Sequence, residues 1–217
     1  GYSISHMFSR KNSLPKGSKK LIGAWTLYDW ANSVYSLVIS TAIFPIYYSE
    51  YIFANTDSII LFNIDLNKDT IISLVSATAF MIVAFLSPLL SGIADYLGNK
   101  KIFMKFFVFL GSFSCVGLYW FELETIQFGL VLYVSALIGL WGSLVFYNSY
   151  LPDITYPDQT NMVSAKGFTM GYIGSVILLI INLIMITYYE QLNLNSEVQA
   201  MKYSFVLVGL WWLIFSQ

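Results

Sequence analysis

A single acidic residue, Asp29, lies within an apolar stretch near the start of the chain, AWTLYDWANSVYS. Polar side chains follow it at offsets of three, four, seven and eleven residues: Asn32, Ser33, Ser36 and Ser40. These offsets place all five on one face of an α-helix. A carboxylate deep in a membrane costs roughly 2.5–3.5 kcal/mol, so this face is expected to line a bundle interior or a hydrated cavity, where Asp29 binds a substrate group or carries a proton.

A shallower position for Asp29 is the alternative. The residue lies eight positions beyond Leu21, which is about 12 Å along a helix from the expected cytoplasmic end. Lys19 or Lys20 could extend toward that end and pair with it. The sequence favours an Asp29 that faces a cavity, and an ion pair with Lys19 or Lys20 stays the alternative.

A later apolar stretch, 167–189, carries a second buried polar candidate, Asn182, and three regularly spaced glycines. Asn182 either contacts a solute or bonds to a neighbouring helix. For Gly167, Gly171 and Gly174, close helix packing is favoured over contact with a ligand.

Composition indicates a membrane protein. The chain has 217 residues, of which 57% are hydrophobic and 11% charged, whereas soluble domains carry about 25% charged residues. A net charge of −1 gives no reason to expect a nucleic-acid partner. Cys115 and His6 are the only residues of their kinds, and the apolar stretches lack paired carboxylates. We therefore expect no metal, no cofactor and no enzyme activity.

Six apolar stretches are candidates for membrane-spanning helices, each needing about 20 residues. They cover 21–49, 71–94, 102–121, 126–151 and 167–189, and a sixth begins near Tyr203. From Tyr203 to the last residue the chain makes only about 22 Å of helix, so we expect a sixth helix cut short and a chain that is part of a longer one. The outer segment 51–70 fits either a short strand or an interfacial helix.

The charges predict the organisation and orientation of the chain. Residues 1–6 precede the first methionine and are interpreted as an expression remnant, 7–20 as a cytoplasmic segment, and 21–217 as the six-helix transmembrane half. With the N-terminus cytoplasmic, only Lys68 and Lys202 lie outside. The other basic residues then lie inside: Arg10, Lys11, Lys16, Lys19, Lys20, Lys100, Lys101, Lys105 and Lys166.

A short charged loop, GIADYLGNKK, connects the second and third stretches. The simple interpretation is a tight turn with inner lysines. The functional one is a conformational latch, because a carboxylate such as Asp95 can meet the positive N-terminus of another helix in one conformation and leave it in another.

This loop resembles the characteristic cytoplasmic motif of the major facilitator superfamily, G-x-x-x-D-[RK]-x-G-x-[RK]-[RK]. Ser91 stands where the motif has its first glycine, Gly92 follows it, and Tyr96 replaces a basic residue. Four positions match: Asp95, Gly98, Lys100 and Lys101. The resemblance implies that these four, with Gly92, form the latch.

Five segments resemble the vacuole-effluxer-like branch of that superfamily: AWTLYDWANSVYS, TAIFPIYY, GIADYLGNKK, FYNSYLPDI and SAKGFTMGYIG. Fungal members of the branch are associated with amino-acid release from the vacuole. The resemblance implies a twelve-helix transporter of which this chain is the N-terminal half. It also implies paired three-helix repeats and a central site lined by helices 1 and 4.

The leading hypothesis is a secondary transporter that moves a small solute such as an amino acid by alternating access. Its site would comprise Asp29, Asn32, Ser33, Ser36 and Asn182. The alternative is a membrane scaffold or receptor that keeps the transporter fold. Expected partners are the lipid bilayer, the solute, and either the missing C-terminal half or a second copy of the fragment. A bacterial inner membrane is the favoured location, with the vacuolar membrane as its eukaryotic counterpart.

Overall fold

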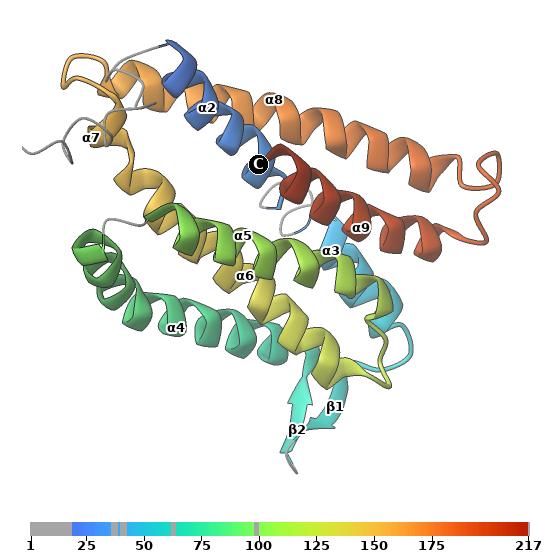
Figure 1. The fold of residues 1–217 in the computed structure, drawn as a ribbon. Helices are drawn as coiled ribbons and strands as arrows, with labels where there is room; N and C mark the ends of the chain where they lie inside the picture. Colours follow the sequence, from blue (N-terminus) through green and yellow to red (C-terminus); the bar gives the residue numbers. More distant parts are fainter. Residues whose placement is uncertain (1–18, 36–38, 40–42, 62–63, 98–99, 217) are drawn as a thin grey trace, which may run out of the picture.

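The computed structural model describes residues 19–35, 39, 43–61, 64–97 and 100–216, and most of them are helical (Figure 1). The predicted all-α membrane fold is confirmed, because five of the helices are long and apolar enough to cross a membrane. In chain order the helices are α2 (Lys19–Val34), α3 (Phe44–Ile46), the π-helical η2 (Tyr47–Ile52), α4 (Lys68–Leu97), α5 (Lys100–Gly117), the 3₁₀-helical η3 (Leu118–Trp120), α6 (Ile126–Ser149), α7 (Leu151–Ile154), α8 (Thr160–Thr187) and α9 (Glu197–Phe215).

The first predicted span, 21–49, is described in parts. Helix α2 forms its first portion, and α3 and η2 form its last portion. Residues 36–38 and 40–42 lie outside the described residues, and with them the stripe positions Ser36 and Ser40.

The start predicted for the sixth helix, near Tyr203, is wrong. Helix α9 begins at Glu197 and is 19 residues long, enough to cross a membrane. Ser196 caps it, because its hydroxyl accepts a hydrogen bond from the backbone N–H of Gln199 at 3.2 Å. The polar first turn hides this start from a search for apolar residues, although Ser196 and Gln199 have the spacing of a capping box.

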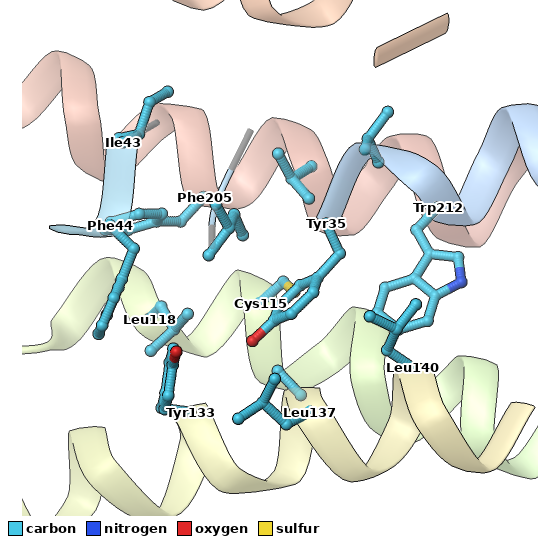
Figure 2. Packing of buried hydrophobic residues seen from close by; sticks show 14 of the residues in the cluster. Tyr35, Ile43, Phe44, Cys115, Leu118, Tyr133, Leu137, Leu140, Phe205 and Trp212 are labelled. Atoms are coloured by element: carbon cyan, nitrogen blue, oxygen red, sulfur yellow. The ribbon is translucent and has the colours of Figure 1, made fainter. Parts of the chain in front are cut away.

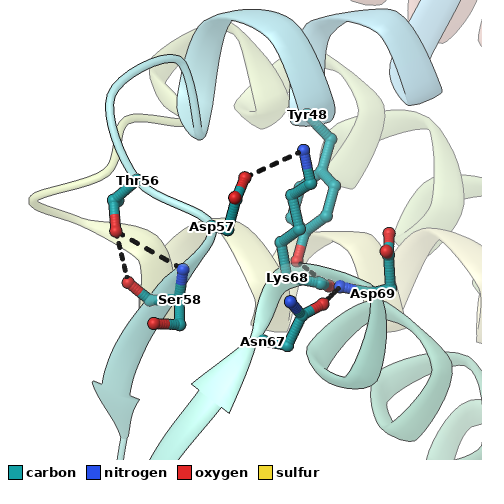
Figure 3. A network of polar contacts seen from close by, with 7 residues as sticks. All are labelled: Tyr48, Thr56, Asp57, Ser58, Asn67, Lys68 and Asp69. Atoms are coloured by element: carbon teal, nitrogen blue, oxygen red, sulfur yellow. Dashed lines mark hydrogen bonds and ion pairs between the residues drawn. The ribbon is translucent and has the colours of Figure 1, made fainter.

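The outer segment forms a β-hairpin, which decides between the two predicted alternatives. Strand β1 (Ser58–Leu61) pairs antiparallel with β2 (Ile64–Asn67). Polar contacts tie the base of the hairpin to the bundle (Figure 3): Lys68 Nζ lies 3.6 Å from the Asp57 carboxylate, and the Tyr48 hydroxyl donates to the Lys68 carbonyl at 2.6 Å.

The spanning helices pack in a pseudo-symmetric pattern. Helix α2 packs on α8 and α9, α6 packs on α4 and α5, and α5 contacts α9 (Figure 1). Helices α2, α4 and α5 correspond to α6, α8 and α9, in that order. Under this correspondence the α2–α8 pair matches the α6–α4 pair, the α2–α9 pair matches the α6–α5 pair, and the α5–α9 pair matches itself. Two three-helix repeats related by a pseudo-twofold axis produce this arrangement.

The core lies where these helices meet. Tyr35, Phe205 and Trp212 are fully buried there, together with Cys115 (Figure 2). Glycines permit the closest crossing: a Cβ added at Gly139 of α6 would lie 2.5 Å from the Cα of Gly111 on α5.

The outward faces of α4 and α8 are apolar and exposed. On α4 the side chains of Met81 and Phe85 are 73% and 79% exposed, and on α8 Ile180 is 51% exposed. Surfaces of this kind require lipid or another hydrophobic partner.

Candidate solute-binding site

The described part of the polar stripe faces an open cavity between α2, α6 and α8. The cavity has a volume of about 460 Å³. It is lined by Asp29, Asn32, Ser33, Leu140, Leu144, Tyr147, Asn148, Phe168, Tyr172 and Ser175. Asp29 is the one charged side chain among these lining residues, so the described wall attracts cations.

Hydroxyl groups hold both oxygens of the half-buried Asp29 carboxylate. Ser33, one turn further along α2, donates to Oδ1 at 2.5 Å, and Tyr147 of α6 donates to Oδ2 at 3.3 Å. The alternative ion pair with Lys19 or Lys20 does not form among the residues that the structure describes. The carboxylate is therefore oriented by neutral donors and keeps lone pairs for a further partner.

Asn32 adds a hydrogen-bond donor to the cavity wall. The residue is 2% exposed, and its Oδ1 lies 3.4 Å from the Ser33 hydroxyl. Its Nδ2 has no hydrogen-bond partner among the described residues. A buried amide N–H without a partner costs about 1–3 kcal/mol, which an acceptor on a bound solute would offset.

Tyr147 is a site residue that the sequence reasoning missed. Its ring stacks on Trp25 of α2, with centroids 4.2 Å apart, and on Tyr28, with centroids 5.0 Å apart. The Trp25 indole N–H also donates to the Tyr147 carbonyl at 3.0 Å. The available signal in the sequence was its place in FYNSYLPDI, at the end of a predicted span and beside Asn148, which lines the same cavity.

The three predicted packing glycines lie where α8 approaches α2. A Cβ at Gly167 would lie 2.7 Å from the Trp25 ring, and one at Gly174 would lie 2.9 Å from the Trp30 ring. At Gly171 a Cβ would lie 2.3 Å from the Ser33 hydroxyl and 2.7 Å from Asp29 Oδ1. The α8 backbone thus closes one side of the carboxylate, and the glycines make that approach possible.

The structure does not bring Asn182 to the cavity wall. Asn182 is fully buried on the packed face of α8, two turns beyond Ser175, and is not among the lining residues. Neither atom of its amide group has a hydrogen-bond partner in the described part of the chain. The expected bond to a neighbouring helix is therefore not seen there.

The predicted latch residues lie at the far end of α4. The Asp95 carboxylate pairs with Lys100, the first residue of α5, at 3.4 Å, and the Lys100 ammonium lies 5.8 Å from the centre of the Tyr150 ring. Gly92 has open space around it, and Lys101 is exposed. Gly98 lies outside the described residues.

Comparison with known proteins identifies the family of the chain. The chain matches the family described as "Vacuole effluxer Atg22 like" over residues 17–162 and 155–217. It is 37% identical over 195 residues to the "Uncharacterized MFS-type transporter YxiO" of Bacillus subtilis (strain 168), a match that covers 89% of this chain and 44% of that protein. The chain thus spans less than half the length of that relative. No solved structure matches it. The five segments and the family match agree, and the chain belongs to the vacuole effluxer Atg22-like family.

Proposed function

We propose that the protein is a secondary transporter that moves a small solute by alternating access, and that the solute carries a protonated amino group, as an amino acid does. Asp29 is the observation that carries the proposal. Its carboxylate lies within the membrane-spanning bundle, at a cavity wall, with no cationic partner among the described residues. Such a group is expected to bind a cation or a proton.

Neutral donors and aromatic rings around Asp29 favour an amino acid over a simple inorganic cation. The free Asn32 Nδ2 suits a carboxylate oxygen of the solute. The exposed rings of Phe168 and Tyr172, whose centroids lie 4.8 Å apart, offer apolar surface and an attractive face to an ammonium group. The family is described as an effluxer and the relative as an MFS-type transporter, which supports transport and suggests export.

The complete site requires more than this chain. The relative is more than twice as long as the matched region, and the apolar faces of α4 and α8 are exposed. We propose that a second half of the transporter covers these faces and forms the other wall of the cavity. The Asp95–Lys100 pair would act as the latch, and the N-terminus would be cytoplasmic in a bacterial inner membrane.

Counterflow of labelled amino acids into liposomes tests the proposal. Liposomes carrying the full-length protein are preloaded with unlabelled amino acids, and entry of a labelled L-amino-acid mixture is measured. Removing one partner of a buried ion pair costs about 3–5 kcal/mol, so Asp29→Asn should lower exchange about 100-fold or more. The matched control is Asp65→Asn, which changes an exposed carboxylate on the outer hairpin and should leave exchange unchanged.

The same assay separates the transporter from the scaffold or receptor. Exchange that survives Asp29→Asn would keep the transporter but remove Asp29 from solute binding. Wild-type protein that exchanges no amino acid would reject the amino-acid proposal and favour a different solute or the scaffold.

A further inference from the structure

Tyr147 connects two groups of helices that meet at the cavity. Helix α2 packs mainly on α8 and α9, whereas α6 packs mainly on α5 and α4. The hydrogen bond from the Tyr147 hydroxyl to Asp29 Oδ2 crosses from one group to the other, between residues 118 positions apart in the chain. Ser33 cannot supply this connection, because it lies on the same helix as Asp29 and moves with it.

Tyr147 is itself held firmly by α2. Its side chain is 3% exposed, and its ring lies nearly parallel to the Trp25 ring, at an interplanar angle of 8°. The Trp25 N–H donates to its backbone carbonyl, and Tyr28 packs against the same ring. These contacts restrict both the backbone and the ring, so the hydroxyl has little freedom to leave Asp29.

We propose that Tyr147 is a positioning residue that fixes the Asp29 carboxylate in one orientation at the cavity wall, and that Trp25 fixes Tyr147 in turn. A carboxylate already ordered by the protein loses less freedom when it binds a solute ammonium group. The inference rests on the proposed function, since it concerns how Asp29 meets the solute.

The first test is the concentration dependence of counterflow by the full-length protein, using the amino acid that exchanges fastest in the wild type. Tyr147→Phe keeps the ring and removes the hydroxyl. It should raise the half-saturating concentration about tenfold, as expected for loss of a hydrogen bond to a charged group, while the maximal rate changes less than about twofold.

Tyr133→Phe is the matched control. Tyr133 is a buried tyrosine of the same helix whose ring stacks on Phe44, with centroids 4.5 Å apart, and it does not line the cavity. Equal effects of the two substitutions would overturn the proposal, because they would reflect general loss of a buried hydroxyl.

The second test does not require transport. The full-length protein is labelled with fluorotryptophan, and the Trp25 resonance in the fluorine NMR spectrum is assigned with Trp25→Phe. Asp29→Asn and Tyr147→Phe should each shift this resonance, and the double variant should shift it no further than Tyr147→Phe alone, because the two residues act through one hydrogen bond.

The two tests fail in distinguishable ways. If Asp29→Asn does not shift the Trp25 resonance, the positioning role of Tyr147 is overturned, even if transport depends on Asp29. Absence of amino-acid exchange together with a coupled Trp25 resonance would reject the proposed solute and leave the Trp25–Tyr147–Asp29 link in place.

Discussion

Asp29 is surrounded by hydroxyl groups and by helix backbone. Ser33 and Tyr147 donate to its two oxygens, and on the α8 side the nearest position is Gly171, which has no side chain. Because Gly171 has no side chain, the Asp29 carboxylate and the Ser33 hydroxyl both fit against α8. A larger residue there would have to displace one of them.

Gly171→Ala is therefore expected to impair the site. The added Cβ would lie 2.3 Å from Ser33 Oγ, closer than side-chain atoms normally approach. Overpacking of this kind costs about 1–3 kcal/mol, so we expect a lower melting temperature in detergent and weaker solute exchange. Gly23→Ala is the control on α2, where an added Cβ meets nothing within 4 Å. A Gly171→Ala protein as stable and active as Gly23→Ala would contradict this account of the glycine.

At the scale of single elements, the ends of helices carry information that their apolar middles do not. Helix α9 starts at a polar cap: the Ser196 hydroxyl accepts from the Gln199 N–H, and the Gln199 side chain accepts from the Asn195 N–H at 2.7 Å. The first bond satisfies a backbone donor that the helix leaves without a partner at its N-terminus, and the second holds the residue before the cap.

Ser196→Ala should loosen the first turn of α9. Loss of an N-cap side chain costs about 1 kcal/mol, and the cost should be local because the rest of the helix is packed. We expect faster amide hydrogen exchange over residues 197–201, measured by mass spectrometry. Ser196→Asn replaces one good cap with another and should keep the wild-type rate. Equal acceleration in both variants would show that the cap does not hold this turn.

At the scale of the whole molecule, the described part of the helical bundle has a cavity that is open on one side. The described wall comes from α2, α6 and α8, and the exposed apolar faces of α4 and α8 are unsuited to water. In a membrane, lipid or a protein partner would cover those faces. The match covers 44% of the Bacillus relative, and the second half proposed above would cover these faces.

The isolated chain is expected to self-associate and to lack saturable transport. Light scattering in detergent should give a mass above that of one 24.6 kDa chain, and liposomes containing only this chain should not take up labelled amino acids in a saturable way. The full-length protein is the positive control. A monodisperse monomer would contradict the self-association, and saturable uptake by the chain alone would contradict the need for a second half.

The sequence by itself determined the class of the protein and the contents of one helix face. Apolar content and run length depend only on local composition, and the offsets of Asn32 and Ser33 from Asp29 follow from the helical period. The same local reasoning could not decide between strand and helix for the outer segment, and it placed the start of α9 too late because the capped first turn is polar.

Only the tertiary structure decided what faces Asp29. Helical periodicity indicates which side chains share a face, but it contains nothing about which other helix approaches that face. Tyr147 lies 118 residues away in sequence and meets Asp29 because α6 and α2 both line the cavity. Asn182 was predicted from the sequence to contact the solute. The structure instead buries it on the face of α8 that packs into the bundle.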